Sequence, residues 1–253
     1  MITGSNFADT LAGGAGADLL NGAANSDTYV YRSGDGSDRI DESNGSTADV
    51  DVLRFLDLNV ADVTFSHRIG GDDLLITINS TGDVIEVDEQ FWSTASNWGV
   101  ERIEFADGTS WDLAKIASEA WYRGTSAGET IVGSSFNDKI DGAAGNDTLS
   151  GGVGNDLLVG GAGNDLLTGG AGSDFYLFGS AAFGLDRLLD FGDGATNEDV
   201  VAFSSSVFAN FAAVQSASAQ VGGNVVITYD ASNSITINNV LLSSLDANDF
   251  NFV

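Results

Sequence analysis

One nine-residue phrase is repeated six times without a gap from Gly124, and it restricts the fold more than any other feature of the chain. The six copies read GTSAGETIV, GSSFNDKID, GAAGNDTLS, GGVGNDLLV, GGAGNDLLT and GGAGSDFYL. A shorter array opens the chain with GSNFADTLA from Gly4, GGAGADLLN from Gly13 and GAANSDTYV from Gly22. After two inserted residues, SGDGSDRID from Ser33 returns to the same register. A short period of this kind predicts a stacked array of like units.

Two positions of the unit hold one kind of side chain in every copy. The sixth position is acidic: Asp9, Asp18, Asp27, Asp38, Glu129, Asp138, Asp147, Asp156, Asp165 and Asp174. The eighth position is apolar: Leu11, Leu20, Tyr29, Ile40, Ile131, Ile140, Leu149, Leu158, Leu167 and Tyr176. Alternate side chains of a strand face opposite sides, so the unit predicts a six-residue loop and a three-residue strand with its middle side chain turned inward. Two units then complete a turn, and loops two units apart stack.

The composition of the loops points to a metal ion. Glycine permits backbone conformations that are closed to other residues, and it leaves the loop carbonyls uncovered. Each loop also brings one carboxylate, and stacked carboxylates repel one another unless a cation lies between them. An all-oxygen environment suits a hard cation with six to eight ligands, and calcium tolerates an adaptable loop better than magnesium does.

These residues match the nonapeptide GGxGxDxUx, so the chain resembles the RTX (repeats-in-toxin), haemolysin-type calcium-binding proteins. The resemblance implies an all-β fold built on a parallel β-roll, with several calcium ions per chain bound between units i and i+2. In that family, the carbonyls of positions 2 and 4 and the carboxylate of position 6 of the lower loop bind the ion. The upper loop adds the carbonyls of positions 1 and 3 and the carboxylate of position 6.

The resemblance places the ligands of four calcium sites on this chain. The four sets are Gly152, Gly154 and Asp156 with Gly169, Ala171 and Asp174; Ala143, Gly145 and Asp147 with Gly160, Ala162 and Asp165; Ser134, Phe136 and Asp138 with Gly151, Val153 and Asp156; and Ser5, Phe7 and Asp9 with Gly22, Ala24 and Asp27. Further candidate ligands are Gly14, Gly16, Asp18 and Asp38, whose pairing crosses the two-residue insertion, and Gly161, Gly163, Gly170 and Gly172. Glu129 departs from the aspartate of the other copies.

Composition excludes several classes of partner. The chain has 253 residues with a formal charge of −28, and 43% of its residues are hydrophobic. It can therefore bury a core, unlike disordered acidic tails. Such a negative charge repels nucleic acids and anionic lipids, and we expect no nucleic-acid partner and no membrane insertion. The absence of cysteine excludes disulfides, thiolate nucleophiles and cysteine-ligated zinc.

The segments outside the arrays predict a β closure after each one. Residues 50–55, 63–68, 73–79, 84–87 and 100–105 alternate apolar and polar side chains, which predicts antiparallel strands. Asp112 can cap a helix whose apolar positions run to Trp121, with Gly124 as its stop. The second half follows the same plan, since DVVAF at 199–203 matches DVLRF at 51–55. We expect two domains, 1–123 and 124–253, each an array with its closure.

The resemblance extends to localisation. The first closure is similar to segments found beside RTX arrays, and the end of the chain is similar to serralysin-type C-terminal modules. These similarities imply a secreted bacterial protein, exported by type I (ABC) secretion machinery through an uncleaved C-terminal signal, which folds on extracellular calcium. The predicted function is the C-terminal folding and secretion module of such a protein. The alternative is a calcium-dependent polysaccharide-binding or adhesin module.

Catalytic patterns are weak, and we expect no enzyme. GTSAG at 124–128 matches the esterase pattern GxSxG, but it lies in repeat register and not between a strand and a helix. His67 is the sole histidine, which excludes a HExxH zinc site and is typical of a packing or surface residue. The aromatic residues Trp92, Trp98, Trp111, Trp121 and Tyr122 would bind sugar rings if they formed an exposed row.

Overall fold

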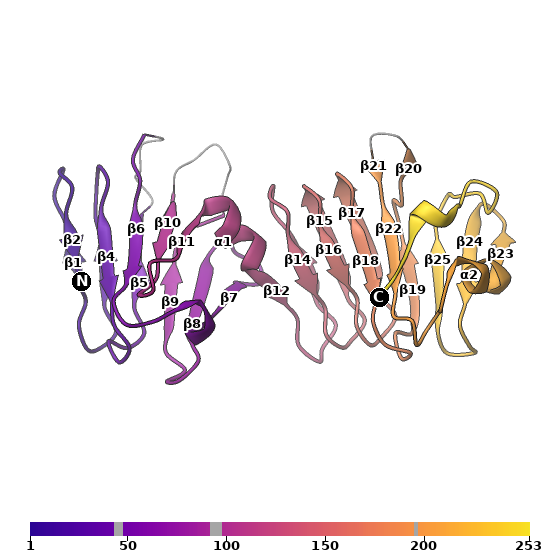
Figure 1. Ribbon diagram of the computed structural model, residues 1–253, viewed down its shortest axis with the longest axis horizontal. Helices are drawn as coiled ribbons and strands as arrows, with labels where there is room; N and C mark the ends of the chain where they lie inside the picture. The colour runs from indigo at the N-terminus through magenta and orange to yellow at the C-terminus, as the bar shows by residue number, and fades with distance from the viewer. Residues whose placement is uncertain (43–47, 92–97, 195–196) are drawn as a thin grey trace. The chain divides into compact units, whose positions relative to one another are not determined.

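The computed structural model describes the chain except for residues 43–47, 92–97 and 195–196. It contains two compact units, Met1–Trp121 and Tyr122–Val253. Each unit is mostly β, and each contains one short helix, α1 (Leu113–Glu119) or α2 (Phe211–Ala217) (Figure 1). The predicted parallel β-roll with short helices is confirmed in both units.

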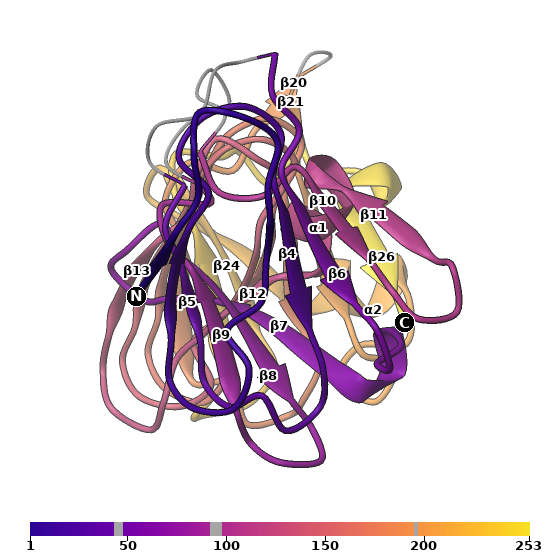
Figure 2. The ribbon, with the colours of Figure 1, turned by 90° about the vertical axis from the view of Figure 1, so that its left-hand side faces the viewer.

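The first unit is built from two sheets. In spatial order, one sheet contains β1 (Ile2–Thr3), β3 (Leu19–Asn21), β5 (Arg39–Ile40), β9 (Val84–Val87), β8 (Leu74–Ile78) and β7 (Val63–His67). The other contains β2 (Thr10–Leu11), β4 (Thr28–Tyr31), β6 (Val52–Phe55), β10 (Arg102–Glu104) and β11 (Ser110–Asp112). Figure 2 shows β5 and β9 on one side of this roll and β4 and β6 on the other. A short 3-10 helix, η1 (Val60–Asp62), precedes β7.

The second unit has the same construction. One sheet contains β14 (Lys139–Asp141), β16 (Leu157–Val159), β18 (Phe175–Phe178), β22 (Val200–Phe203) and β26 (Phe250–Phe252). The other contains β13 (Thr130–Val132), β15 (Thr148–Val153), β17 (Leu166–Ala171), β19 (Leu185–Leu188), β25 (Ser234–Ile237), β24 (Asn224–Thr228) and β23 (Ser218–Val221). The remaining elements are the pair β20 (Asp193–Gly194) and β21 (Asn197–Glu198) and the 3-10 helix η2 (Ala247–Asp249).

Strand register confirms that two nonapeptides make one turn. Ile131 pairs with Leu149, and Leu149 pairs with Leu167, in parallel and 18 residues apart. The three side chains occupy the eighth position of their units and are at most 1% exposed. They stack into one core with the eighth-position side chains of the other sheet. This continuous core gives each short strand the burial that it lacks alone.

Glycine is required where successive turns touch. Gly163 has a φ of 147°, which L-residues with a side chain rarely adopt. A Cβ atom built there would collide with the carbonyl oxygen of Gly145, one turn below. The glycine-rich loops therefore let the backbones of neighbouring turns approach closely, which brings their carbonyl oxygens together.

Two expectations about the first closure need correction. β7, β8 and β9 are antiparallel as predicted, but β6 pairs in parallel with β4 and β10 pairs in parallel with β6. These two strands continue the roll because the acidic residue before each one bonds to the turn below, as described in the next section. The predicted helix is capped by Asp112, whose Oδ1 accepts from Lys115 N–H at 2.8 Å, but it ends at Glu119.

The helix ends early because the next residues take up the nonapeptide register. Tyr122 stands nine residues before Ile131, so it occupies an eighth position, and it is buried in the core of the second unit. Residues Trp121–Arg123 accordingly form the strand β12.

Candidate metal centre

The sixth-position carboxylates of the second unit form two hydrogen-bonded ladders. In each step, Oδ1 of one carboxylate accepts the amide N–H of the acidic residue one turn earlier. The first ladder runs from Glu129 to Asp147 (2.6 Å), Asp165 (2.8 Å) and Asp186 (2.8 Å). The second runs from Asp138 to Asp156 (2.8 Å), Asp174 (2.9 Å) and Asp199 (2.9 Å).

The first unit contains equivalent ladders. One runs from Asp9 to Asp27 (2.7 Å), Asp51 (2.7 Å) and Glu101 (2.6 Å), and the other joins Asp18 to Asp38 (3.0 Å). The structure therefore brings Asp18 and Asp38 together across the insertion at Tyr31 and Arg32. It also aligns acidic residues within each unit that lie far apart in the sequence.

The second oxygen of many of these carboxylates has no hydrogen-bond partner. Among the described residues, the buried and unpartnered atoms are Oδ2 of Asp27, Asp147, Asp156, Asp165, Asp174 and Asp186, and Oε1 of Glu101. A buried carboxylate oxygen without a donor is strongly destabilising, and it is rare in folded proteins. A row of such atoms fits cations that bind between successive turns.

Loop carbonyls approach Oδ2 of the sixth-position aspartates, which has no partner in Asp147 and Asp156 but accepts from Ser134 in Asp138 and from Ser5 in Asp9. The position that a Cβ of Gly151 would occupy is contacted both by Oδ2 of Asp156 and by the carbonyl oxygen of Gly169. In three more predicted sites, the carboxylate of the lower loop likewise lies beside the first-position carbonyl of the upper loop. These pairs are Asp138 with Gly151, Asp147 with Gly160, and Asp9 with Gly22. Glu129 meets the Gly142 carbonyl in the same way. One carbonyl and one carboxylate of each predicted site are thus adjacent.

The third-position carbonyls are arranged differently. The carbonyl oxygens of Ala162 and Ala171 accept backbone N–H groups from Gly145 and Gly154, each at 2.8 Å. A carbonyl oxygen has a second lone pair, so this contact leaves one acceptor site on each. Side chains such as Phe7 (77% exposed) and Val153 (57% exposed) turn outward, which leaves only their carbonyls as candidate ligands. The complete ligand sets stay a prediction.

Burial raises the pKa of several ladder carboxyls, among them Asp156, Asp186 and Glu101. Desolvation is the largest cause, with repulsion from neighbouring carboxylates adding to it, and it raises the pKa of Asp156 to about 7. The same causes raise the pKa of Asp186 to about 8 and that of Glu101 to about 7. Without a cation, these groups therefore hold protons at a pH where free carboxyls are ionised.

This gives a pH dependence whose sign depends on calcium. In calcium-free buffer the free energy of unfolding is expected to rise as the pH falls from about 8 to about 5, because the raised pKa values make the folded state the better proton binder. The destabilisation by these carboxyls is complete above the pKa values that they have in the folded state, which reach about 8 at Asp186. It disappears below their pKa values in the unfolded state, about 4. In excess calcium the trend is expected to reverse, since protons compete with the metal. The circular-dichroism signal of the folded state across this pH range, with and without calcium, measures both trends, and parallel curves would contradict the prediction.

Besides Glu129, four ladder residues lie outside the predicted site set. Glu101, Asp186 and Asp199 end their ladders and Asp51 precedes Glu101, although all four stand in the closures or after irregular spacings. Their shared sequence signal is an acidic residue two positions before a buried apolar one, as in Asp186-Arg187-Leu188.

The other candidate groups are structural. His67 is 3% exposed, its ring centroid lies 3.9 Å from that of Phe91, and burial lowers its pKa to about 3, so it packs in the core of the first unit. Trp98, Trp111 and Trp121 are half-buried, Tyr122 is buried, and Trp92 lies outside the described residues. No helix in the described parts of the chain is long and apolar enough to span a bilayer.

Fold and site together define a β-roll whose stacked loops collect carboxylates. The sequence matches the family model of the RTX calcium-binding nonapeptide repeat over residues 3–40, 123–158 and 150–181. It also matches the haemolysin-type calcium binding protein related domain over residues 73–115. The chain therefore carries RTX, haemolysin-type calcium-binding repeats in both units, and these repeats imply that it binds calcium.

The comparison with solved structures finds similarity to two proteins. The extracellular lipase LipA from Serratia marcescens matches with a TM-score of 0.44 and 18% identity, over 95% of this chain and 39% of the lipase. The AlgE6R2 subunit of the Azotobacter vinelandii mannuronan C5-epimerase matches with a TM-score of 0.42 and 24% identity, over 52% of this chain and 92% of the subunit. This chain thus spans well under half the length of the lipase. No curated protein sequence matches it.

Proposed function

We propose that this chain is a non-catalytic calcium-dependent folding module of a secreted protein. The observation that carries the proposal is the set of buried carboxylate oxygens without hydrogen-bond partners among the described residues, two in the first roll and five in the second. Calcium would balance the negative charge of these carboxylates, which have no donor on their second oxygen. The loop carbonyls beside them complete an all-oxygen environment. The residues of the repeats hold the ion, and binding is coupled to folding because the loops stack only in the folded state.

The calcium concentration then decides where the chain folds. Extracellular calcium modules have dissociation constants of about 10⁻⁴ to 10⁻³ M, far weaker than cytosolic calcium buffers. With a formal charge of −28, the metal-free chain also repels itself in the compact state. A chain of this kind stays unfolded at low calcium, in a form that can pass through a type I exporter, and folds on reaching millimolar calcium.

Export from bacteria that carry a type I system tests this proposal. A reporter protein fused ahead of residues 1–253 is expected to appear in the medium only when the exporter is present. The matched control lacks residues 124–253, so it keeps the first repeat array and loses the second unit. Secretion that is equal with and without the exporter, or an exported module that stays unfolded in millimolar calcium, would refute the assignment.

The structure gives no specific support to a second function. The polysaccharide-binding or adhesin alternative depends on an exposed aromatic row, but the tryptophans of the described residues are half-buried. Trp111, for example, packs against Phe65 and Phe105 at centroid distances of 5.0 and 5.3 Å. Sugar binding therefore stays a prediction from the sequence.

A further inference from the structure

Glu42 occupies a position that is glycine in nearly every repeat. It follows the unit Ser33–Asp41 directly, so it is the first residue of the next nonapeptide register. Between the first and third units, the Gly22 carbonyl oxygen lies over Gly4. One turn later, Oε1 of Glu42 lies over Gly22 instead, 2.5 Å from the place where a Cβ would stand, and accepts the Gly22 N–H at 3.0 Å. A carboxylate thus replaces a loop carbonyl.

Glu42 completes a group of three buried carboxylates. One oxygen each from Asp27, Glu42 and Asp51 lies within 4.8 Å of the other two, and all three residues are 1% exposed. Asp27 and Asp51 are successive members of a ladder, so Glu42 adds a third carboxylate to a step that has two in the regular repeats.

The group contains an oxygen that no protein donor satisfies. Oδ2 of Asp27 is buried and without a hydrogen-bond partner, and it faces Glu42 in the space that a Cβ of Gly22 would fill. Of the ion pairs in the described part of the chain, none reaches Asp27, Glu42 or Asp51. Three carboxylates are therefore gathered away from water with no basic side chain beside them.

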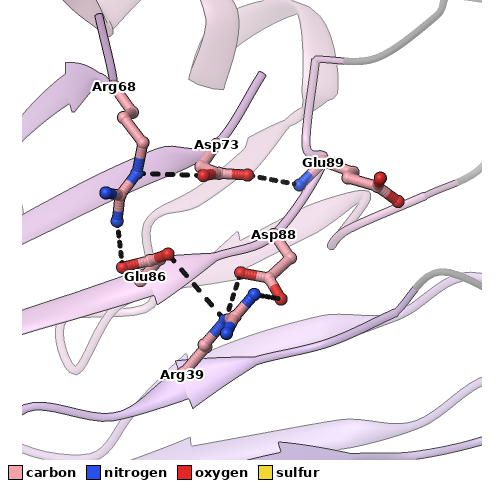
Figure 3. A network of polar contacts seen from close by, with 6 residues as sticks. All are labelled: Arg39, Arg68, Asp73, Glu86, Asp88 and Glu89. Carbon is pink, nitrogen blue, oxygen red and sulfur yellow. Dashed lines mark hydrogen bonds and ion pairs between the residues drawn. The ribbon is translucent and has the colours of Figure 1, made fainter. Parts of the chain in front are cut away.

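In a second group of acids in the same unit, basic side chains of the protein itself pair with the carboxylates. Asp73, Glu86 and Asp88 also lie within 4.8 Å of one another, but two arginines stand among them (Figure 3). Arg39 contacts Asp88 at 2.7 Å, while Arg68 contacts Asp73 at 2.9 Å and also pairs with Glu86. The two guanidinium charges offset most of the negative charge of that group.

The second unit has an acid in the place of Glu42, but its oxygens are occupied. Asp190 stands at the corresponding first position, and its Oδ1 accepts from Gly169 N–H at 3.0 Å and from the Tyr176 hydroxyl at 3.2 Å. Its Oδ2 accepts from Gly170 N–H at 2.9 Å. The group around Glu42 is therefore particular to the first unit among the described residues.

We infer that Asp27, Glu42 and Asp51 form a calcium site of their own, in which three carboxylates replace the mixed carbonyl and carboxylate set of the repeats. The higher ligand charge favours tighter binding than at the repeat sites, because calcium affinity rises with the number of charged ligands. Such an ion ties the last turn of the first array to the closure that follows it.

Counting bound calcium in the full chain tests the inference. Glu42→Gln keeps an Oε1 acceptor for the Gly22 N–H, so the fold is expected to survive in calcium. Elemental analysis after dialysis at saturating calcium is expected to find one ion fewer per chain than in the wild type.

Glu86→Gln is the matched control, since it makes the same substitution in the acid group that arginines neutralise, and its ion count is expected to equal that of the wild type. If Glu42→Gln does not fold, Asp51→Asn provides the second variant and is expected to lose the same ion. Unchanged counts in these variants would overturn the inference and indicate that protons alone occupy the group. A wild type that binds no calcium would instead refute the proposed function.

Discussion

Removal of calcium with EDTA is expected to abolish the folded state of both units, giving a random-coil circular-dichroism spectrum and no cooperative melting. At a calcium concentration tenfold above the dissociation constant, each site contributes about 1.4 kcal/mol to stability. Four sites predicted from the repeats thus contribute about 6 kcal/mol, which is comparable to the whole stability of many domains. Without the metal, the buried carboxylates of the ladders oppose folding as well.

The control for this experiment is EDTA saturated with calcium, which is expected to leave the spectrum and melting temperature unchanged. Refolding is expected on return to millimolar calcium and not with the same concentration of magnesium, which demands a stricter octahedral geometry. A spectrum and melting midpoint unaffected by EDTA would contradict the metal sites and the proposed function together.

Asp156→Asn is expected to be among the most damaging single substitutions in calcium. Asp156 serves two predicted sites, because it is the upper carboxylate over Asp138 and the lower carboxylate beneath Asp174. Its Oδ1 holds the Asp138 amide and its Oδ2 is buried without a partner, so the variant removes the charge that two ions share. The expected loss in calcium is about 3 kcal/mol or more, as for breaking other buried charge pairs.

Asp9→Asn is the matched control for that variant. Asp9 lies at the start of the first array and serves one predicted site, and no amide donor from an earlier turn reaches it among the described hydrogen bonds. Urea unfolding and calcium titration of both variants are expected to show the larger loss for Asp156→Asn. Equal losses of bound calcium would rule out ions shared between successive turns.

The regular part of this fold follows from the sequence because its physics is local and periodic. A buried apolar side chain at each eighth position and an acid at each sixth position define strand, loop and register, and the pairing of Ile131 with Leu149 agrees with them. The helix start at Asp112 is equally local, since one side chain caps it.

The closures are less predictable because their pairing depends on distant residues. Asp51 bonds to Glu101, which lies 50 residues later, and nothing in the length of the intervening segment fixes that partner. Alternation of apolar and polar side chains does not distinguish an antiparallel strand from a parallel one. For this reason the sequence pattern predicts antiparallel pairing for β6 and β10, whereas both pair in parallel with their neighbours. Glu42 was missed because its role arises only where the register continues past the recognisable repeats.

The ladders impose a direction on assembly. Each loop receives its acceptor from the turn that follows, so a turn is complete only after its C-terminal neighbour is in place. In the first unit one ladder ends at Asp38 within the array and the other at Glu101, and in the second unit the ladders end at Asp186 and Asp199. Glu101, Asp186 and Asp199 lie beyond the regular repeats. Order in a stacked array spreads between neighbours. We therefore expect the irregular segments to act as templates from which each roll grows back toward its own beginning.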